Sequence, residues 1–335
     1  MENFENQNQE NQRPEFHSRI EMTELRDNLD KIKNEIGKII VGQESMIEHL
    51  LAALLCNGHV LIEGVPGVAK TITAKLLAKT IDVGFSRIQF TPDLMPSDIL
   101  GTSIFNMKIS EFEFKKGPIF SNFILIDEIN RSPAKTQAAL FEVMEERQIT
   151  MDGNRYIMEE PFLVVATQNP IEHEGTYRLP EAQLDRFLFK INVGYPNLEQ
   201  EIEIIKNQHE SKLENKIDAV KSVVSGQQLK SYQQIVKNII VEPNLLEYIA
   251  KIIINTRENQ FLYLGASPRA SLALLTASKS FAAIRGRDFV TPEDIKEASY
   301  AVLRHRVIVS PEREMEGLSA DEIIRQILEN IEIPR

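Results

Sequence analysis

The sequence predicts an α/β fold in which a parallel, doubly wound sheet is followed by an all-helical domain. Five short apolar runs, with helical stretches between several of them, lie within residues 59–193. This alternation is typical of a parallel sheet with helices on both faces. Beyond residue 195 only helical patterns follow. The length of 335 residues, of which 42% are hydrophobic, agrees with about two domains and a sizeable core.

The N-terminal segment changes character near residue 20. Residues 1–19 are rich in Asn, Gln and Glu and nearly lack apolar side chains, so we expect a disordered polar tail. From Met22 to Gly37 apolar residues recur at three- and four-residue spacing, which predicts a helix. The apolar content of Glu44–Cys56 predicts a second, buried helix. These helices open the first domain, to which we assign residues 20–195.

Each of the five apolar runs predicts a buried strand of the sheet. They are short, and the first of them leads through a glycine-rich loop into a helix over Ile72–Thr80. Together they predict a five-stranded parallel sheet. The predicted strands are His59–Glu63, Arg87–Phe90, Phe123–Asp127, Phe162–Thr167 and Phe187–Val193.

The second predicted domain comprises residues 196–335. Ser267-Pro268 and Thr291-Pro292 each place a capping side chain before a first-turn proline, which marks the start of a helix. We interpret Leu272, Leu274 and Leu275 as core residues of this domain. The predicted helices are Glu199–Glu210, Gln227–Lys237, Asn244–Asn255, Pro268–Ile284, Pro292–Leu303 and Ala320–Ile331.

The charge and cysteine content exclude several classes of protein. With 38 basic and 49 acidic residues the net charge is −11, which argues against nucleic acid as the main partner. Cys56 is the only cysteine, which excludes an intramolecular disulfide framework and a cysteine-cluster zinc site. The N-terminus lacks the apolar core of a signal peptide, and no apolar run reaches the roughly 18 residues of a membrane span. We therefore expect a cytoplasmic protein.

The glycine-rich loop after the first strand is the strongest functional signal. Phosphate groups are bound by backbone N–H groups at a helix N-terminus together with a lysine ammonium. We expect Lys70 to reach the β- and γ-phosphates of a nucleotide and the Thr71 hydroxyl to bind Mg²⁺. Glycine usually precedes this lysine, and Ala69 fits there if its backbone is helical. The predicted cofactor-binding residues of this segment are Gly64, Val65, Pro66, Gly67, Val68, Ala69, Lys70, Thr71 and Ile72.

Two other strands end in polar residues. Because the carboxyl ends of parallel strands meet at one edge of the sheet, we expect these residues beside the glycine-rich loop. Asp127 can hold Mg²⁺ through its water shell, and Glu128 can polarise an attacking water as a general base. Asn169 can hydrogen-bond the γ-phosphate and that water. In isolation, Asn169-Pro170 would indicate only a turn.

Three arginines that lie far from the glycine-rich loop in the sequence are candidates for binding phosphate. Arg178 and Arg186 precede the last strand, and Arg269 lies in the first turn of a predicted helix. An arginine that projects here could insert into the phosphate site of a neighbouring subunit. A solvated salt bridge is the alternative for the first two, and Arg269 would project from the helical domain toward the nucleotide.

These elements, in this order, resemble an AAA+ ATPase over roughly residues 35–305. The resemblance is closest to the MoxR family, in the segments IIVGQ, EGVPGVAKT, FTPDLMPSDILG, GPIF, LIDEINR, ALFEVMEERQIT, ATQNPIEHEGTYRLPEAQLDRF and GASPRA. It implies an αβα P-loop core followed by a helical lid. It also implies assembly as a homo-oligomeric ring, often hexameric, with ATP and Mg²⁺ bound at the subunit interfaces.

The same resemblance implies roles for individual residues. Asn169 is similar to the residue called sensor 1. Arg186 is similar to the arginine finger, which acts on the neighbouring subunit, with Arg178 as the alternative. Arg269 is similar to sensor 2, which acts in cis or in trans. The residues expected near adenine are Val41, Gly42 and Gln43.

Two segments resemble the hairpins inserted in MoxR, magnesium-chelatase and replicative-helicase proteins. Residues 100–118 alternate in the manner of strands, with Phe112 and Phe114 flanked by charged residues. Residues 148–160 surround Asp152-Gly153, a strong turn signal. In related rings such hairpins engage the client, and the alternative is that both only cover the edges of the core.

The first functional hypothesis is an ATP-driven motor that remodels a protein client, as a chaperone-like assembly factor. Water activated by Glu128 would attack the γ-phosphate, while Lys70, Mg²⁺ and a neighbour's Arg186 stabilise the developing charge. The resemblance implies a von Willebrand factor A domain partner and maturation of complexes or metal centres. The alternatives are a nucleic-acid motor or regulator of the same fold, and a nucleotide-gated scaffold that does not hydrolyse ATP.

Overall fold

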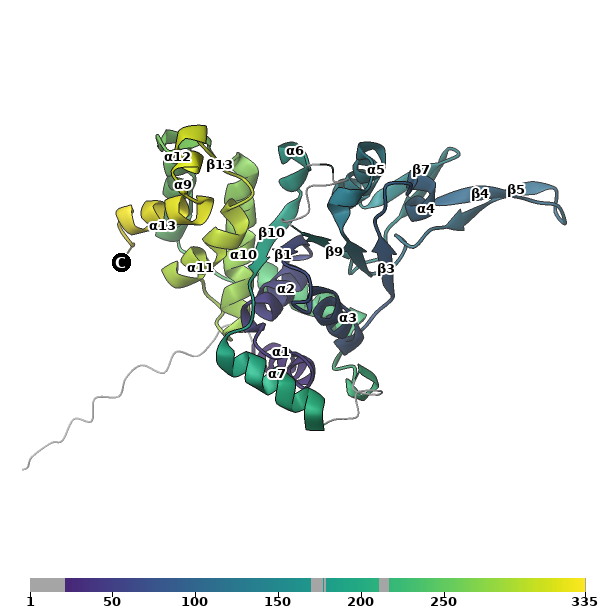
Figure 1. The fold of residues 1–335 in the computed structure, drawn as a ribbon, viewed down its shortest axis with the longest axis horizontal. Coiled ribbons are helices and arrows are strands. Elements are labelled where there is room, and N and C mark those ends of the chain that lie inside the picture. Colours follow the sequence, from purple (N-terminus) through teal and green to yellow (C-terminus); the bar gives the residue numbers. More distant parts are fainter. Residues whose placement is uncertain (1–21, 170–176, 178, 211–216, 335) are drawn as a thin grey trace, which may run out of the picture.

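The computed structural model of this chain describes residues 22–169, 177, 179–210 and 217–334. The predicted tail at residues 1–19 and the candidate Arg178 lie outside these residues. The fold prediction is confirmed: a parallel sheet of five strands lies at the centre of the first part of the chain, and a mainly helical part follows (Figure 1).

The central sheet has the strand order β10-β1-β9-β6-β3, and all neighbours pair in parallel. The first strand therefore lies inside the sheet, between strands that follow it by about a hundred residues and more. All five predicted strands are present, with ends that differ from the prediction by at most two residues. They are β1 (His59–Gly64), β3 (Phe85–Gln89), β6 (Phe123–Asp127), β9 (Leu163–Gln168) and β10 (Phe187–Val193).

Both faces of the sheet are covered, which explains why an inner strand such as β6 is apolar along most of its length. Alternate residues of β6 enter different clusters: Phe123 and Leu125 pack on one face, and Ile124 and Ile126 on the other. The first face is covered by α1, α2 and α3, and the second by α4 and α5. These helices are α1 (Thr23–Gly37), α2 (Glu44–Cys56), α3 (Lys70–Thr80), α4 (Pro96–Leu100) and α5 (Ala134–Glu146).

Both predicted hairpins are confirmed. The first projects far from the body of the molecule (Figure 1). The second turns at Asp152 and Gly153, whose φ angles of +51° and +78° suit a tight two-residue turn. The paired strands are β4 (Gly101–Asn106) with β5 (Glu111–Lys116), and β7 (Gln148–Met151) with β8 (Asn154–Ile157).

The described residues after 195 form helices and short strands joined by loops, and the sequence analysis did not predict these strands. β12 (Leu262–Leu264) pairs antiparallel with β13 (Ile308–Val309), and β11 (Val224–Ser225) pairs with β2 (Ile81–Asp82) of the first part. Two- and three-residue strands are too short to show the alternation on which prediction depends. The helices are α7 (Leu198–Glu210), α8 (Gly226–Lys237), α9 (Pro243–Glu258), α10 (Pro268–Ile284), α11 (Pro292–Leu303), α12 (Pro311–Met315) and α13 (Ala320–Asn330).

One hydrophobic cluster continues from α1, α2 and α3 into helices α8, α9, α10, α11 and α13. Leu274 is fully buried in it, but the expectation that Leu272 is a core residue is wrong, because this side chain is 67% exposed. None of the described helices is both long and apolar enough to cross a bilayer. Three further helical segments are short. These segments are η1 (Ile129–Arg131), α6 (Glu181–Leu184) and η3 (Ile217–Ala219).

The free edge of β10 is held by three consecutive residues that follow α11. His305 Nε2 lies 2.9 Å from the carbonyl oxygen of Phe187, and Arg306 Nη2 donates to the same oxygen at 2.6 Å. Arg304 donates to the carbonyl oxygen of Lys190 at 3.3 Å. Side chains of the helical part thus satisfy carbonyl groups that an edge strand would otherwise expose.

Candidate functional site

The glycine-rich loop between β1 and α3 wraps tightly through positive φ angles. Gly67 has φ +85°, and Ala69, which directly precedes α3, has φ +62° and ψ +17°. Ala69 therefore lacks the usual right-handed form of the helical backbone that was the condition for alanine to fit here. The loop demands the left-handed conformation that glycine usually supplies here, and alanine adopts it at a cost of about 1 kcal/mol.

The first two residues of α3 connect the loop to the sheet. The ammonium group of Lys70 donates to the carbonyl oxygens of Gly64 and Val65, the latter at 3.2 Å. The hydroxyl of Thr71 donates to Oδ1 of Asp127, at the end of β6, at 3.0 Å. The structure thus brings the loop and the strand-end carboxylate together, as the sequence predicts.

The two carboxylates have different partners. Asp127 accepts a 2.6 Å hydrogen bond from Nε of Arg87, and Thr167 Oγ1 lies 3.2 Å from its Oδ1. Glu128 has φ +59°, accepts from Nε2 of Gln89 at 2.9 Å, and lies 3.2 Å from Nε of Arg131. Both carboxylates are thereby held at the carboxyl edge of the sheet, facing the glycine-rich loop.

These residues line one cavity of about 710 Å³, within the usual range of ligand sites. Pro66 to Ile72 line it together with Asp127, Glu128 and Asn169, so the structure brings most of the predicted site residues together. The hydroxyl of Thr71 and the carboxylate of Asp127 are oxygen donors of the kind that Mg²⁺ prefers, and they lie close enough to share one ion.

Three predicted residues, Val41, Gly42 and Gln43, do not line this cavity. Gly42 has φ +75°, and a Cβ atom there would overlap the side chain of Gln200 in α7. This segment therefore packs against α7. Gly64 and Val65 lie just outside the lining and contribute the carbonyl groups that Lys70 contacts.

Sequence reasoning missed five polar residues of the lining: Lys75 on α3, Arg87 and Gln89 on β3, and Thr167 and Gln168 on β9. Arg87 and Gln89 are two residues apart and therefore point to the same face of their strand. The sequence shows these two polar residues at alternate positions of a short strand. Only the strand order, which pairs Gln89 with Asp127, shows that they lie beside the carboxylates.

Arg186 and Arg269 lie together at a different place. Both contact Glu145: Arg186 Nε is 3.7 Å from Oε2, and Arg269 Nη2 is 2.8 Å from Oε1. They line a second cavity, of about 330 Å³, with Asp185 and Arg306. Nε of Arg186 is buried there without a hydrogen-bond partner.

The sheet register explains this separation. Phe187, next to Arg186, pairs with His59 at the start of β1, whereas the glycine-rich loop follows Gly64 at its end. A strand of this length spans about 17–20 Å. The arginine pair therefore lies at the amino ends of the parallel strands, and the loop lies at their carboxyl ends. Neither arginine lines the cavity that contains Asp127 and Glu128.

Arg306 connects this arginine pair to the helical part of the chain. Its buried guanidinium donates from Nε to Asp185 Oδ1 at 2.6 Å. Asp185 also accepts from the hydroxyl of Ser267, the residue before α10, at 3.2 Å. Because Asp185 precedes Arg186 and Ser267 lies near Arg269, one carboxylate fixes the backbone next to both arginines.

Comparisons with known proteins agree with this geometry. Residues 59–189 match the ATPase family associated with various cellular activities (AAA), and residues 254–327 match the AAA lid domain. Chaperone MoxR1 of Mycobacterium tuberculosis is 45% identical over 316 residues, which cover 92% of this chain and 82% of that protein. YeaC of Bacillus subtilis is 45% identical over 306 residues, covering 91% and 95%.

A solved structure shows the same fold. It is the crystal structure of a protein from Cytophaga hutchinsonii that is assigned as an ATPase. The two chains are 44% identical and superpose with a TM-score of 0.86, over 94% of this chain and 97% of the other. The fold, the loop and carboxylate geometry, and these relatives together show that this chain belongs to the MoxR family of AAA+ ATPases.

Proposed function

We propose that this protein binds and hydrolyses ATP in a head-to-tail ring and uses the energy to remodel a protein client. The observation that carries the proposal is the cavity where the glycine-rich loop, Thr71, Asp127, Glu128 and Asn169 converge. Phosphoryl transfer to water needs a loop that offers N–H groups, a lysine, oxygen donors for Mg²⁺ and a carboxylate that can accept a proton.

In this reaction the protein acts mainly by binding and positioning the reacting groups. The loop amides and Lys70 bind the phosphate chain of ATP, and Thr71 and Asp127 would hold Mg²⁺, which neutralises phosphate charge when bound. Asn169 orients a water. Glu128 accepts a proton from this water as its oxygen bonds to the γ-phosphorus and the bond to the bridging oxygen breaks, which yields ADP and phosphate.

The position of Arg186 and Arg269 supports a site shared between two subunits. Their side chains lie at the sheet edge opposite the loop of their own chain. Placed against the loop edge of a neighbour, the two guanidinium groups would stabilise the charge that develops on the γ-phosphate. Repetition of this contact produces a ring, for which we propose six subunits, with Arg186 and Arg269 both acting in trans.

The β4–β5 hairpin supports a protein client. Its tip carries apolar side chains in solvent: Met107 is 87% exposed and Phe112 is 73% exposed. Exposed apolar groups on a projecting hairpin suit contact with another protein. A chaperone-like role agrees with the relative named Chaperone MoxR1. We propose that it acts in the cytoplasm, on complexes or metal centres, with a von Willebrand factor A domain partner.

Glu128→Gln tests the proposal. The amide keeps the size of the side chain but cannot accept the proton, so steady-state phosphate release should fall by about a hundredfold or more while ATP binding persists. Glu142→Gln, at an exposed position of α5, is the matched control and should leave turnover unchanged. Wild-type turnover in Glu128→Gln would exclude Glu128 as the general base. No turnover in the unaltered protein would leave a nucleotide-gated scaffold as the better assignment.

A further inference from the structure

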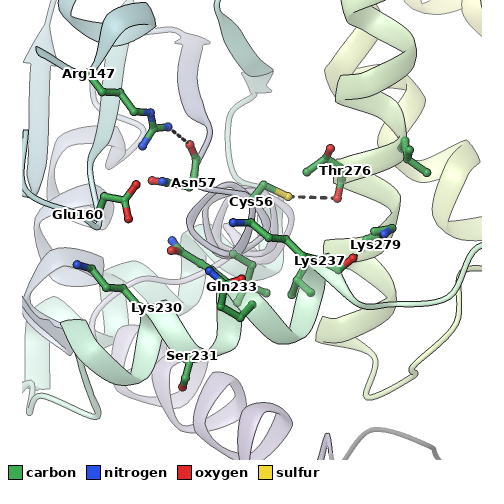
Figure 2. Close-up of a pocket in the computed structure, with 14 residues that line it drawn as sticks. Cys56, Asn57, Arg147, Glu160, Lys230, Ser231, Gln233, Lys237, Thr276 and Lys279 are labelled. Carbon is green, nitrogen blue, oxygen red and sulfur yellow. Dashed lines mark hydrogen bonds between the residues drawn. The ribbon is translucent and has the colours of Figure 1, made fainter.

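A third cavity, distinct from the nucleotide site and from the cavity of Arg186 and Arg269, lies between the two parts of the chain. It has a volume of about 510 Å³ and shares no lining residue with the nucleotide cavity. Figure 2 shows its walls: the end of α2 with Cys56 and Asn57, Arg147 after α5, Glu160, and the facing sides of α8 and α10. Its volume lies within the range of small-molecule sites.

Positive charge dominates this cavity. Four cationic side chains, Arg147, Lys230, Lys237 and Lys279, line it together with one carboxylate, Glu160. Within the described part of the chain, none of these five groups forms an ion pair at 4.0 Å or less. Lys279 instead donates to the carbonyl oxygen of Lys237 at 2.8 Å, and Arg147 donates to that of Asn57. The cavity therefore has cationic charge that internal carboxylates do not compensate.

Two buried polar atoms of the lining lack hydrogen-bond partners. Nη1 of Arg147 and Oδ1 of Asn57 are buried without a hydrogen bond. Burial also lowers the pKa of Arg147, against an opposing effect of Glu160, and burial lowers the pKa of Lys279. Desolvated cations and an unused amide oxygen gain hydrogen bonds from a ligand that carries anionic groups and hydroxyl groups.

We propose that this cavity binds a small phosphorylated ligand with at least two phosphate groups and a hydroxylated body, such as a sugar bisphosphate. The phosphates would contact Arg147 from the first part of the chain and Lys230 and Lys237 from the second. A concave cavity bounded by several elements favours a small molecule over an extended acidic peptide.

The cavity lies next to the residues that contact Arg186 and Arg269. Arg147 and Asn57 also line the cavity that holds Arg186 and Arg269. Arg147 is two residues from Glu145, which contacts both of those arginines. A ligand that binds here connects α8 and α10 to the residues behind the arginine pair. The binding site itself does not depend on the proposed ATPase activity.

Isothermal titration calorimetry of the full chain with fructose 1,6-bisphosphate tests the proposal. We expect saturable binding that weakens with salt, because screening reduces the attraction. The pair of substitutions Lys230→Glu and Lys237→Glu should weaken binding by about tenfold or more, because it reverses two charges at the ligand. Both lysines are exposed, so the variant should fold.

Two control variants make the outcome decisive. Lys206→Glu changes an exposed lysine of α7 outside the cavity and should bind as the unaltered chain does. Lys70→Ala should also bind normally, because the phosphate loop is not involved. Equal weakening by Lys206→Glu would show diffuse attraction and would overturn the proposal, as would loss of binding in Lys70→Ala. Binding of a poly-glutamate peptide without binding of the sugar bisphosphate would reassign the cavity to a protein partner.

Lysine acetylation followed by mass spectrometry gives an independent measurement. Bound fructose 1,6-bisphosphate should slow the acetylation of Lys230 and Lys237 and leave Lys206 unaffected. Fructose, which lacks phosphate, should protect none of them. If the bisphosphate protects no lysine of the cavity at saturation, the ligand binds elsewhere and the assignment is wrong.

Discussion

Ala69 shows how a single residue departs from the usual pattern of its loop. Its φ of +62° lies in the left-handed region, where a Cβ atom crowds the backbone. The sequence shows that alanine replaces the usual glycine, but not which backbone conformation results. The conformation depends on how the loop joins β1 to α3.

Ala69→Gly should therefore raise the free energy of unfolding by about 0.5–1 kcal/mol, because glycine adopts this conformation without strain. Urea unfolding in the absence of nucleotide measures the change. Ala138→Gly, at an exposed position within α5, is the control of opposite sign and should lower the free energy by about 1 kcal/mol. Destabilisation of similar size by both substitutions would contradict the strain at Ala69.

The residues of the nucleotide cavity differ in how far the sequence predicts them. Lys70, Thr71, Asp127 and Glu128 follow from local patterns, because each lies where a strand gives way to a loop or a helix. Arg87 acquires its role only because β3 is placed beside β6. Strand order depends on long-range packing, which no short segment of the sequence records.

At the scale of elements, the contact between α11 and β10 holds the helical part against the sheet. The sequence predicts both elements with the correct ends, but not their contact. The segment Arg304-His305-Arg306 contains two charged residues and a histidine, which suggests solvent exposure. In the structure the Arg306 side chain is only 4% exposed, because it pairs with Asp185 and with several carbonyl groups.

Arg306→Met should lower the free energy of unfolding by about 3 kcal/mol, because it leaves Asp185 and several carbonyl groups without their partner. Urea unfolding measures the loss. Arg26→Met is the matched control: its ion pair with Asp30 is exposed and 4.0 Å long, so the change should stay within about 0.5 kcal/mol. A loss of that small size for Arg306→Met would show that the buried pair does not hold α11 against β10.

At the scale of the whole molecule, three histidines give stability a dependence on pH. Burial lowers the pKa of His59 to about 3, and burial also lowers the pKa of His49 and His305. In the unfolded chain a histidine has a pKa of about 6.5. Below this pH the unfolded chain binds protons that the folded chain does not, so stability is present above about pH 6.5 and is lost as the pH falls.

For His59 alone the loss should amount to about 1.4 kcal/mol for each pH unit between about 6.5 and 3. Urea unfolding at a series of pH values measures the slope. His59→Gln should make the slope shallower, because the amide does not titrate in this range. His209→Gln, on the exposed side of α7, should leave it unchanged. An unchanged slope in His59→Gln would exclude His59 as its source.

The proposed assembly makes a prediction about mixtures. Arg186→Ala and Lys70→Ala should each abolish ATP turnover, because they damage opposite edges of the molecule. Mixed assemblies should regain part of it, since an intact loop can meet an intact arginine pair. Lys70→Ala mixed with Glu128→Gln is the control without recovery, because both changes damage the same edge. Mixed assemblies that form without any recovery would contradict the action of Arg186 in trans.

The parallel sheet also bears on the number of complete reaction sites in an assembly. In the proposed assembly, where Arg186 acts in trans, each copy would carry the loop half of a reaction site at the carboxyl ends of the parallel strands and the arginine half at their amino ends. An open row of copies then always holds one complete site fewer than it has members, and closure of the row supplies the missing one. Turnover per copy thus reports whether the row has closed, although no contact within any copy has changed.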